Sequence, residues 1–343
     1  MSTRQYKSIV EALRETLREE MRKNDRVIVL GEDIGAFGGA YRVTEGLFEE
    51  FGPERVLDTP ISETGIIGAA IGSALTGLHP VAEIQFNDFY LCAMDQICNQ
   101  AAKIHLMSGG QASVPIIMRA PIGATGRAAQ HSQSLEALFM HMPGLKIVMP
   151  ATPYDARGLL KTAFIDENPV MFFEHKLLYG AASPGGKAKS AIGDIQEFFI
   201  PAPEEEYTIP FGQAVRRREG RDLTVVATSY MVLRVLKIAK RLETKGISLE
   251  VIDPRTLVPL DKQTIFESVK KTGRLLIVHE GYSRCGFASE LTTLVIEEIF
   301  DYLDAPVKRV CTMDVPIPFA PNAENYVLPN ETRIENAINE FLQ

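Results

Sequence analysis

The chain has 343 residues, of which 45% are hydrophobic and 23% are charged, and its formal net charge is −8. This composition is typical of a soluble globular protein, and the length predicts two domains. The negative charge argues against a general nucleic-acid-binding protein, and no apolar run reaches the roughly 18 uninterrupted residues that a membrane span needs. We therefore expect neither nucleic acid nor membrane as a partner.

The beginning of the chain, MSTRQYKSIVEALRE, predicts a charged amphipathic helix and not a signal peptide. The four cysteines include no CxxC pair, which predicts reduced thiols. We expect a cytoplasmic protein, or an organelle protein whose transit peptide has been removed.

The first half alternates between helical and strand patterns. Apolar residues at helical spacing predict a helix over 6–21, and further helices are expected from residue 63, over 90–107 and over 153–164. Short apolar strands are predicted at 27–30, 55–57, 80–84, 114–119, 145–149 and 170–174. Continuously apolar strands that alternate with helices predict a parallel sheet with helices on both faces.

The stretch 58–77, DTPISETGIIGAAIGSALTG, is the centre of the first half. Ser62 and Glu63 stand where a helix should begin, because a serine oxygen can accept from free amides and the positive helix end favours a carboxylate. Each glycine inside a helix costs about 1 kcal/mol relative to alanine, so the several glycines here predict close approach of another backbone. We expect this helix to be buried on every face. Glu63 is then either a helix cap or a working acid.

Ligands of parallel α/β sheets bind beyond the carboxyl ends of the strands. Three segments leave strands at that edge: 58–63, 85–89 and 121–134. The third, which includes GATGRAAQHSQS, is long for a connection and places His131 among polar residues. His131 is either a satisfied polar histidine or a group for acid–base chemistry or substrate contact. The other five histidines are expected to be structural.

A turn at 165–169, with the sequence IDENP, presents several oxygen atoms together after the predicted helix over 153–164. Oxygen-rich turns can hold a hard cation, but an ordinary helix end explains the same pattern.

Proline- and glycine-rich sequence from 181 to 210 marks a domain boundary. We expect domains at 1–185 and 211–343 with a linker at 186–210. The second half restarts the alternation, with strands at 223–228, 249–252, 275–279 and 307–311 and helices at 232–245, 287–300 and 331–341. The fold class predicted is therefore α/β, with two doubly wound parallel-sheet domains. The second half shows no cluster of acids, histidines and serines that predicts a site.

Several segments resemble the beta subunits of 2-oxo acid dehydrogenases, in the family's order and over nearly the whole chain. They are DTPISETGIIGAAIG, AEIQFNDF with AMDQICNQAAK, GATGRAAQHSQS with PGLKIVMPATPYDARGLL, IDPRTLVPLD, and HEGYSRCGFASEL. That family forms the thiamine diphosphate-dependent decarboxylating component of pyruvate, branched-chain 2-oxo acid and acetoin dehydrogenase complexes. The resemblance implies a pyrimidine-binding domain in the first half and a transketolase-type C-terminal domain in the second.

The resemblance also implies site residues. Glu63 matches the glutamate that hydrogen-bonds the aminopyrimidine ring of thiamine diphosphate, and Phe89 and Ile61 match apolar walls of the same pocket. His131 matches a histidine implied in substrate binding or in proton movement during acyl transfer to a lipoyl arm. Family members often hold a potassium ion, which would here use Ile116, Ala163, Phe164, Asp166 and Asn168.

The resemblance finally implies partners. Thiamine diphosphate enzymes hold the diphosphate through magnesium with a GDG motif, and this chain has only GDI at 193–195. An alpha subunit is expected to supply the magnesium and diphosphate half, in an assembly of two alpha and two beta subunits that docks on a dihydrolipoyl acyltransferase core. A standalone transketolase-like enzyme would need its own diphosphate motif, and a non-catalytic scaffold chain would need neither Glu63 nor His131. Phe89, where a tyrosine could stand, favours pyruvate over branched 2-oxo acids and acetoin.

Overall fold

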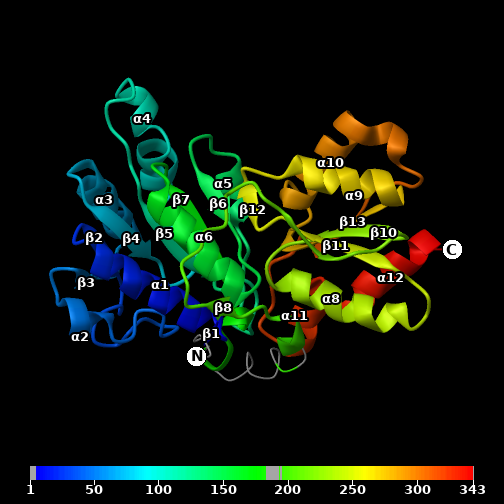
Figure 1. Ribbon diagram of the computed structural model, residues 1–343, viewed down its shortest axis with the longest axis horizontal. Helices are drawn as coiled ribbons and strands as arrows, with labels where there is room; N and C mark the ends of the chain where they lie inside the picture. The colour runs from blue at the N-terminus through cyan, green and yellow to red at the C-terminus, as the bar shows by residue number, and fades with distance from the viewer. Residues whose placement is uncertain (1–4, 183–192, 194, 343) are drawn as a thin grey trace.

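The computed structural model describes residues 5–182, 193 and 195–342, and Figure 1 shows two α/β units side by side. The first is a seven-stranded sheet in the order β12-β6-β7-β5-β4-β2-β3, and the second a five-stranded sheet in the order β14-β13-β10-β11-β9. All neighbouring strands are parallel except one edge strand in each sheet, β12 and β9. The predicted α/β fold with parallel sheets is confirmed.

The strands of the first unit are short, and most of their residues are buried. They are β2 (Val27–Gly31), β3 (Val56–Asp58), β4 (His79–Glu83), β5 (Ile117–Ile122), β6 (Lys146–Val148) and β7 (Val170–His175). Its helices are α1 (Ile9–Lys23), α2 (Leu47–Phe51), α3 (Glu63–Leu75), α4 (Ile104–Met107), α5 (Glu136–Met140) and α6 (Pro153–Ile165). A small antiparallel pair, β1 (Gln5–Tyr6) and β8 (Ala202–Pro203), lies beside α6.

Strand β2 shows why helices cover both faces of this sheet. Val27 and Val29 pack into the core that contains the buried residues of α1 and α6. Ile28 and Leu30, which point the other way, pack into the core that contains those of α3. Because successive side chains of a strand point to opposite faces, an uninterrupted apolar strand needs an apolar layer on each side.

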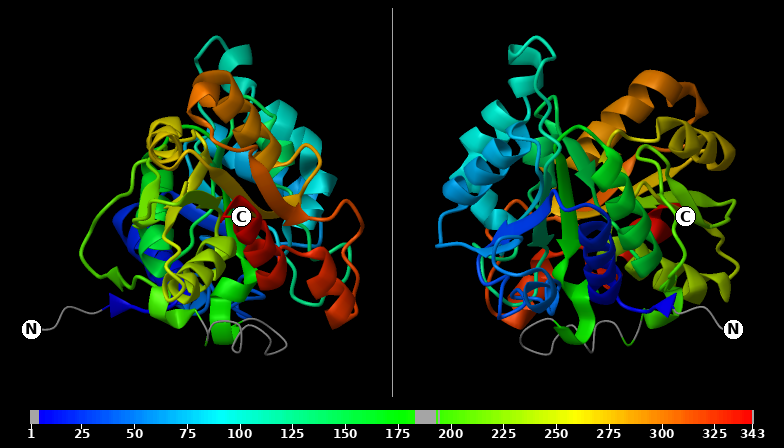
Figure 2. Two further views of the ribbon diagram at one scale, coloured as in Figure 1. Left: turned by 90° about the vertical axis from the view of Figure 1, so that its right-hand side faces the viewer. Right: turned by 60° about the vertical axis from the view of Figure 1, so that its left-hand side comes forward.

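The second unit repeats this plan. Its strands are β9 (Val215–Arg218), β10 (Leu223–Ala227), β11 (Leu249–Asp253), β13 (Leu275–Tyr282) and β14 (Lys308–Thr312). Its helices are α8 (Tyr230–Glu243), α9 (Lys262–Thr272), α10 (Phe287–Ile299), α11 (Pro321–Val327) and α12 (Glu331–Leu342). Figure 2 shows the orange α10 and the red α12 on opposite faces of the yellow strands, and their buried residues belong to different cores.

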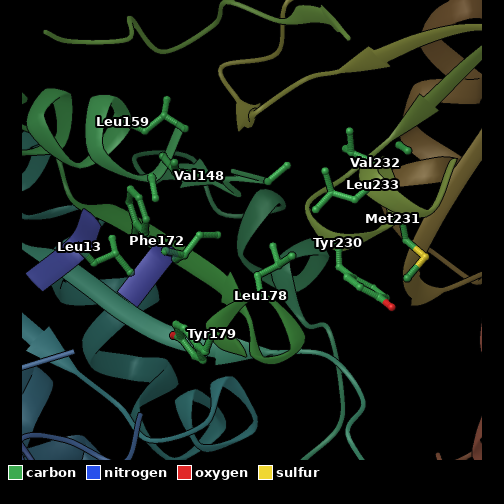
Figure 3. Packing of buried hydrophobic residues seen from close by; sticks show 14 of the residues in the cluster. Leu13, Val148, Leu159, Phe172, Leu178, Tyr179, Tyr230, Met231, Val232 and Leu233 are labelled. Atoms are coloured by element: carbon green, nitrogen blue, oxygen red, sulfur yellow. The ribbon is translucent and has the colours of Figure 1, made fainter. Parts of the chain in front are cut away.

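The two units are joined by more than the connecting chain. Strand β12 (Thr256–Val258) belongs by sequence to the second half but pairs with β6 of the first sheet. Arg217 lies between Asp155 of α6 and Asp253 of β11, with 2.7 Å between Arg217 Nη2 and Asp253 Oδ2. Figure 3 shows the apolar core running from Phe172 across to Leu233 of α8. The expected linker at 186–210 falls partly outside the described residues.

The prediction of a single helix over 90–107 is wrong. The segment is instead a 3₁₀ helix, η1 (Asn87–Ala93), a π-helical turn, η2 (Gln96–Ala101), and the short α4. The Thr64 hydroxyl donates to the Cys92 carbonyl, which an α-helix would use for the amide of residue 96. A tertiary contact thus lies at the point where the helical hydrogen-bond pattern changes.

None of the helices in the described part of the chain combines the length and hydropathy of a bilayer span. All four cysteines are free thiols.

Candidate active site at the carboxyl edge of the first sheet

The first helical residue of α3 is Glu63, and the residue before it is the cap. Ser62 Oγ accepts a hydrogen bond from the Gly65 amide at 3.3 Å. The Glu63 side chain is half-buried, and among the described residues no group donates a hydrogen bond to its carboxylate. Because Ser62 already caps the helix, the carboxylate of Glu63 is left available for a ligand.

A second carboxylate lies near Glu63. Strand β2 stands between β3 and β4, and Glu32 follows directly from its last residue. Burial raises the pKa of Glu32, and the charges of Asp33 and Glu63 raise it further. The sheet edge at this point is thus acidic.

The sequence led us to expect that helix α3 is buried on every face, and this expectation is wrong. One face carries exposed small residues and the half-exposed Leu75, and Ile61 just before the helix is 75% exposed. A methyl group added at Gly72 would meet no other atom within 4 Å. The close approach predicted by the glycines is therefore not made inside this chain, and the face is open to another one.

Aromatic rings connect Phe89 with His131 at the same edge. The two rings lie edge to face with centroids 5.4 Å apart, and Phe86 meets the imidazole of His131 at 4.9 Å. Phe89 and His131 are both half-buried. The structure therefore brings the 85–89 segment and the 121–134 loop together, although they follow different strands.

Polar contacts bind these two segments to each other. Asn87 Nδ2 donates to the Gln133 carbonyl at 2.9 Å, and the Leu135 amide donates to Asn87 Oδ1 at 3.0 Å. Gln133 Nε2 donates to the buried carboxylate of Asp88 at 2.9 Å. The loop that carries His131 is therefore held in a defined place against η1.

The second unit also holds this loop, which the sequence did not lead us to expect. Glu280 accepts from the Ala124 amide at 2.7 Å and from His175 Nε2 at 2.8 Å. Glu324 of α11 accepts from the Gly126 amide at 2.6 Å, and the Tyr282 hydroxyl lies 3.4 Å from Gln133 Oε1. The one signal in the sequence was that Glu280 and Tyr282 belong to the resembling segment HEGYSRCGFASEL.

The proton on His175 can be assigned from its partners. The Leu177 amide donates to Nδ1 at 3.1 Å, so Nδ1 is the acceptor and Nε2 carries the proton that is shared with Glu280. Burial opposes the charge on Glu280, but His175 and the Ala124 amide together lower its pKa. His175 thus connects β7 to β13.

A buried ion triad lies behind the site. Arg119 of β5 bridges Glu83 of β4 at 2.7 Å and Glu174 of β7 at 2.8 Å, and all three side chains are almost fully buried. Burial raises the pKa of Glu83, and the Arg119 guanidinium opposes that rise. Breaking such a pair costs about 3–5 kcal/mol because an uncompensated charge stays inside, so loss of the triad would destabilise the three strands that it links.

In the turn expected to hold a cation, some of the oxygen atoms already accept hydrogen bonds. Asp166 Oδ1 accepts from the Asn168 amide at 2.8 Å and from Asn168 Nδ2 at 2.7 Å. The Val170 amide donates to the Ile116 carbonyl at 2.9 Å, which places Ile116 beside the turn. Ala163 and Phe164 belong to the last turn of α6, where carbonyls lack helical partners and the helix end is negative. In the described residues no group of three or more histidine, cysteine and acidic side chains could hold a metal, so a cation here would depend on carbonyl oxygens.

Known protein families match both units. The transketolase pyrimidine-binding domain matches residues 5–181, and the transketolase C-terminal domain matches residues 212–334. A solved structure described as a split-gene transketolase, an inactive beta4 tetramer, aligns with a TM-score of 0.76 over 98% of each chain. Its identity is 23%, so it supports the fold alone.

Similar curated proteins agree with these family matches. The chain is 46% identical to the pyruvate dehydrogenase E1 component subunit beta of Rickettsia felis, over 96% of this chain and 97% of that one. It is 44% identical to the 2-oxoisovalerate dehydrogenase subunit beta of Bacillus subtilis, over 98% of both chains. It is also 44% identical to the acetoin:2,6-dichlorophenolindophenol oxidoreductase subunit beta of Bacillus subtilis, over 98% of this chain and 97% of that one. The chain belongs to the family of 2-oxo acid dehydrogenase beta subunits, of the pyruvate dehydrogenase type.

Proposed function

We propose that this chain is the beta subunit of an acetyl-transferring pyruvate dehydrogenase. With an alpha subunit it carries out the oxidative decarboxylation of pyruvate and the reductive acetylation of lipoyl groups, using thiamine diphosphate. The observation that carries the proposal is the carboxylate of Glu63, to which no described residue donates, at the sheet edge where Phe89 and His131 meet.

The residues of this edge fit one half of a thiamine diphosphate site. When bound, the cofactor supplies the nucleophilic carbon and the electron sink for decarboxylation. Glu63 would accept a hydrogen bond from the pyrimidine ring and hold the proton that sets its tautomer. Ile61 and Phe89 would form apolar walls that exclude water, and His131 would bind the substrate or move protons during acyl transfer.

The other half of the site calls for a partner. The chain has no GDG motif for magnesium and diphosphate, and the GDI segment at 193–195 includes a residue outside the described part. The exposed side chain of Ile61 and the open face of α3 fit a covering chain. We propose that an alpha subunit holds the magnesium and diphosphate, in an assembly of two alpha and two beta subunits.

A second docking surface is proposed at the end of α10. Glu297, Glu298 and Asp301 are exposed there beside the apolar side chains of Phe300 and Tyr302, which are 63% and 52% exposed. Acidic groups around exposed apolar side chains suit a small basic domain. We propose that the dihydrolipoyl acyltransferase core docks here.

The choice of pyruvate as the substrate rests on Phe89. Identity does not separate the candidates, because pyruvate-type relatives range from 44% to 46% and the 2-oxoisovalerate and acetoin relatives are at 44%. The test is a steady-state assay of the complex copurified with its alpha subunit, using pyruvate, branched 2-oxo acids and acetoin. A higher kcat/KM for a branched 2-oxo acid or for acetoin would make that compound the proposed substrate in place of pyruvate. No turnover with any of the three would favour a non-catalytic scaffold chain.

We further propose that potassium binds at the turn after α6. The ligands would be carbonyl oxygens of Ile116, Ala163 and Phe164 together with Asp166 and Asn168. The support is the negative helix end and the position of Ile116 beside the turn.

A further inference from the structure

We propose that Lys176 is the positioning residue for His131: its buried ammonium holds the His131 backbone carbonyl and so sets where the imidazole lies at the sheet edge. The inference rests on the proposed function, because it concerns the role in substrate binding or acyl transfer that is proposed for His131.

Lys176 contacts His131 from beneath the loop. It is the first residue of η3 (Lys176–Ala182), directly after β7, and its side chain is fully buried. Its Nζ donates to the His131 carbonyl and lies 5.0 Å from the centroid of the Phe86 ring. Phe86 in turn packs edge to face against the imidazole of His131. One side chain thus touches both the backbone of His131 and the ring that supports its imidazole.

The burial of this charge is unusual within the chain. Among the described residues no carboxylate lies within ion-pair distance of Lys176, and the charges of Asp88 and Glu280 favour its ammonium only from farther away. Removing an ammonium from water costs several kcal/mol. Lys161 shows the ordinary solution: it is buried to a similar degree, and it forms ion pairs with Glu19 at 2.8 Å and with Glu20. A charge that is kept buried without an ion-pair partner beside a site residue points to a role in the site.

The rest of the loop is fixed at positions on either side of His131. Glu280 and Glu324 hold the amides of Ala124 and Gly126, and Asn87 holds the carbonyl of Gln133. Lys176 adds a contact at His131 itself. Without it the imidazole would shift relative to Phe89, and a displacement of about 1 Å can cost about a hundredfold in rate.

The test uses the complex with its alpha subunit and compares two reactions. Pyruvate-dependent reduction of 2,6-dichlorophenolindophenol reports decarboxylation, and acetylation of a lipoyl domain reports transfer. We expect Lys176→Met and His131→Ala each to slow transfer by about tenfold or more while dye reduction changes much less. The double variant should be no slower in transfer than His131→Ala alone, because Lys176 acts through His131.

The matched control is Lys161→Met, which removes a buried lysine that does not contact the loop. It should lower the melting temperature and leave the ratio of the two rates unchanged. A second measurement does not depend on turnover: the rate at which diethyl pyrocarbonate modifies His131, followed by peptide mass spectrometry. This modification rate should change in Lys176→Met and stay constant in Lys161→Met. If Lys176→Met does not assemble, Lys176→Leu, which also removes the donor, takes its place in the comparison with His131→Ala.

The outcomes separate this inference from the proposed function. A wild-type complex inactive in both reactions would overturn the proposed function. Transfer that depends on His131 but is unaffected by Lys176→Met, or losses that add up in the double variant, would overturn the inference about Lys176 alone.

Discussion

Replacing Glu63 by glutamine keeps the size of the side chain and removes its negative charge. Ser62 makes the capping hydrogen bond of α3, so the variant should lose at most the helix-dipole contribution of a carboxylate, typically 0.3–1 kcal/mol. Turnover should fall much further, because a positioned group for proton transfer contributes about 10²–10⁴-fold. We therefore expect Glu63→Gln to keep fold and assembly and to lose at least about a hundredfold in rate.

The sharpest assay is exchange of the thiazolium ring proton of the cofactor for deuterium in the reconstituted complex. This exchange isolates activation of the cofactor from decarboxylation and from acyl transfer. Ser62→Ala is the matched control: it should lower stability by about 0.5–2 kcal/mol as a lost cap does and leave the exchange rate intact. Wild-type exchange in Glu63→Gln would refute the assignment and make Glu63 a structural residue.

Three further outcomes follow from the structure. The melting temperature of the assembly should be higher in potassium than in sodium at equal ionic strength. The free energy of unfolding should increase by about 2.7 kcal/mol when potassium is in hundredfold excess over Kd, and identical melting curves would show that the 165–169 turn is an ordinary helix end. The chain expressed alone should bind thiamine diphosphate poorly and self-associate through the open face of α3, as calorimetry and light scattering would show; tight stoichiometric binding would contradict a shared site. Burial lowers the pKa of Lys176 to about 8 from 10.5, so the folded state binds fewer protons than the unfolded state between these values, and its stability rises with pH there. Relative to Lys176→Met, the wild-type free energy of unfolding should thus increase by up to about 3 kcal/mol across that window, and parallel pH profiles of the two proteins would contradict this.

Local periodicity in the sequence was sufficient to predict most of the helices and strands. The helix expected over 6–21 is α1 (Ile9–Lys23), and the one over 153–164 is α6 (Pro153–Ile165). The strand expected at 27–30 is β2 (Val27–Gly31). These elements bury a face or both faces, so their apolar spacing reports their surroundings directly. Glu63 and His131 could likewise be identified from the sequence, because each follows a strand whose carboxyl end the pattern places at one edge. Phe89 was named by the family resemblance.

Tertiary structure decided what depends on contacts between distant segments. The helix expected over 90–107 is interrupted near the point where the Thr64 hydroxyl donates to the Cys92 carbonyl, and no local pattern reports a donor 28 residues away. Strand β12 joined the other unit's sheet, and Glu280 reached the Ala124 amide across 156 residues. No pattern in the sequence singles out Lys176. It becomes a buried charge beneath His131 only because β5 and β7 pair in parallel, with Ile122 opposite His175, and bring both strand ends to one edge.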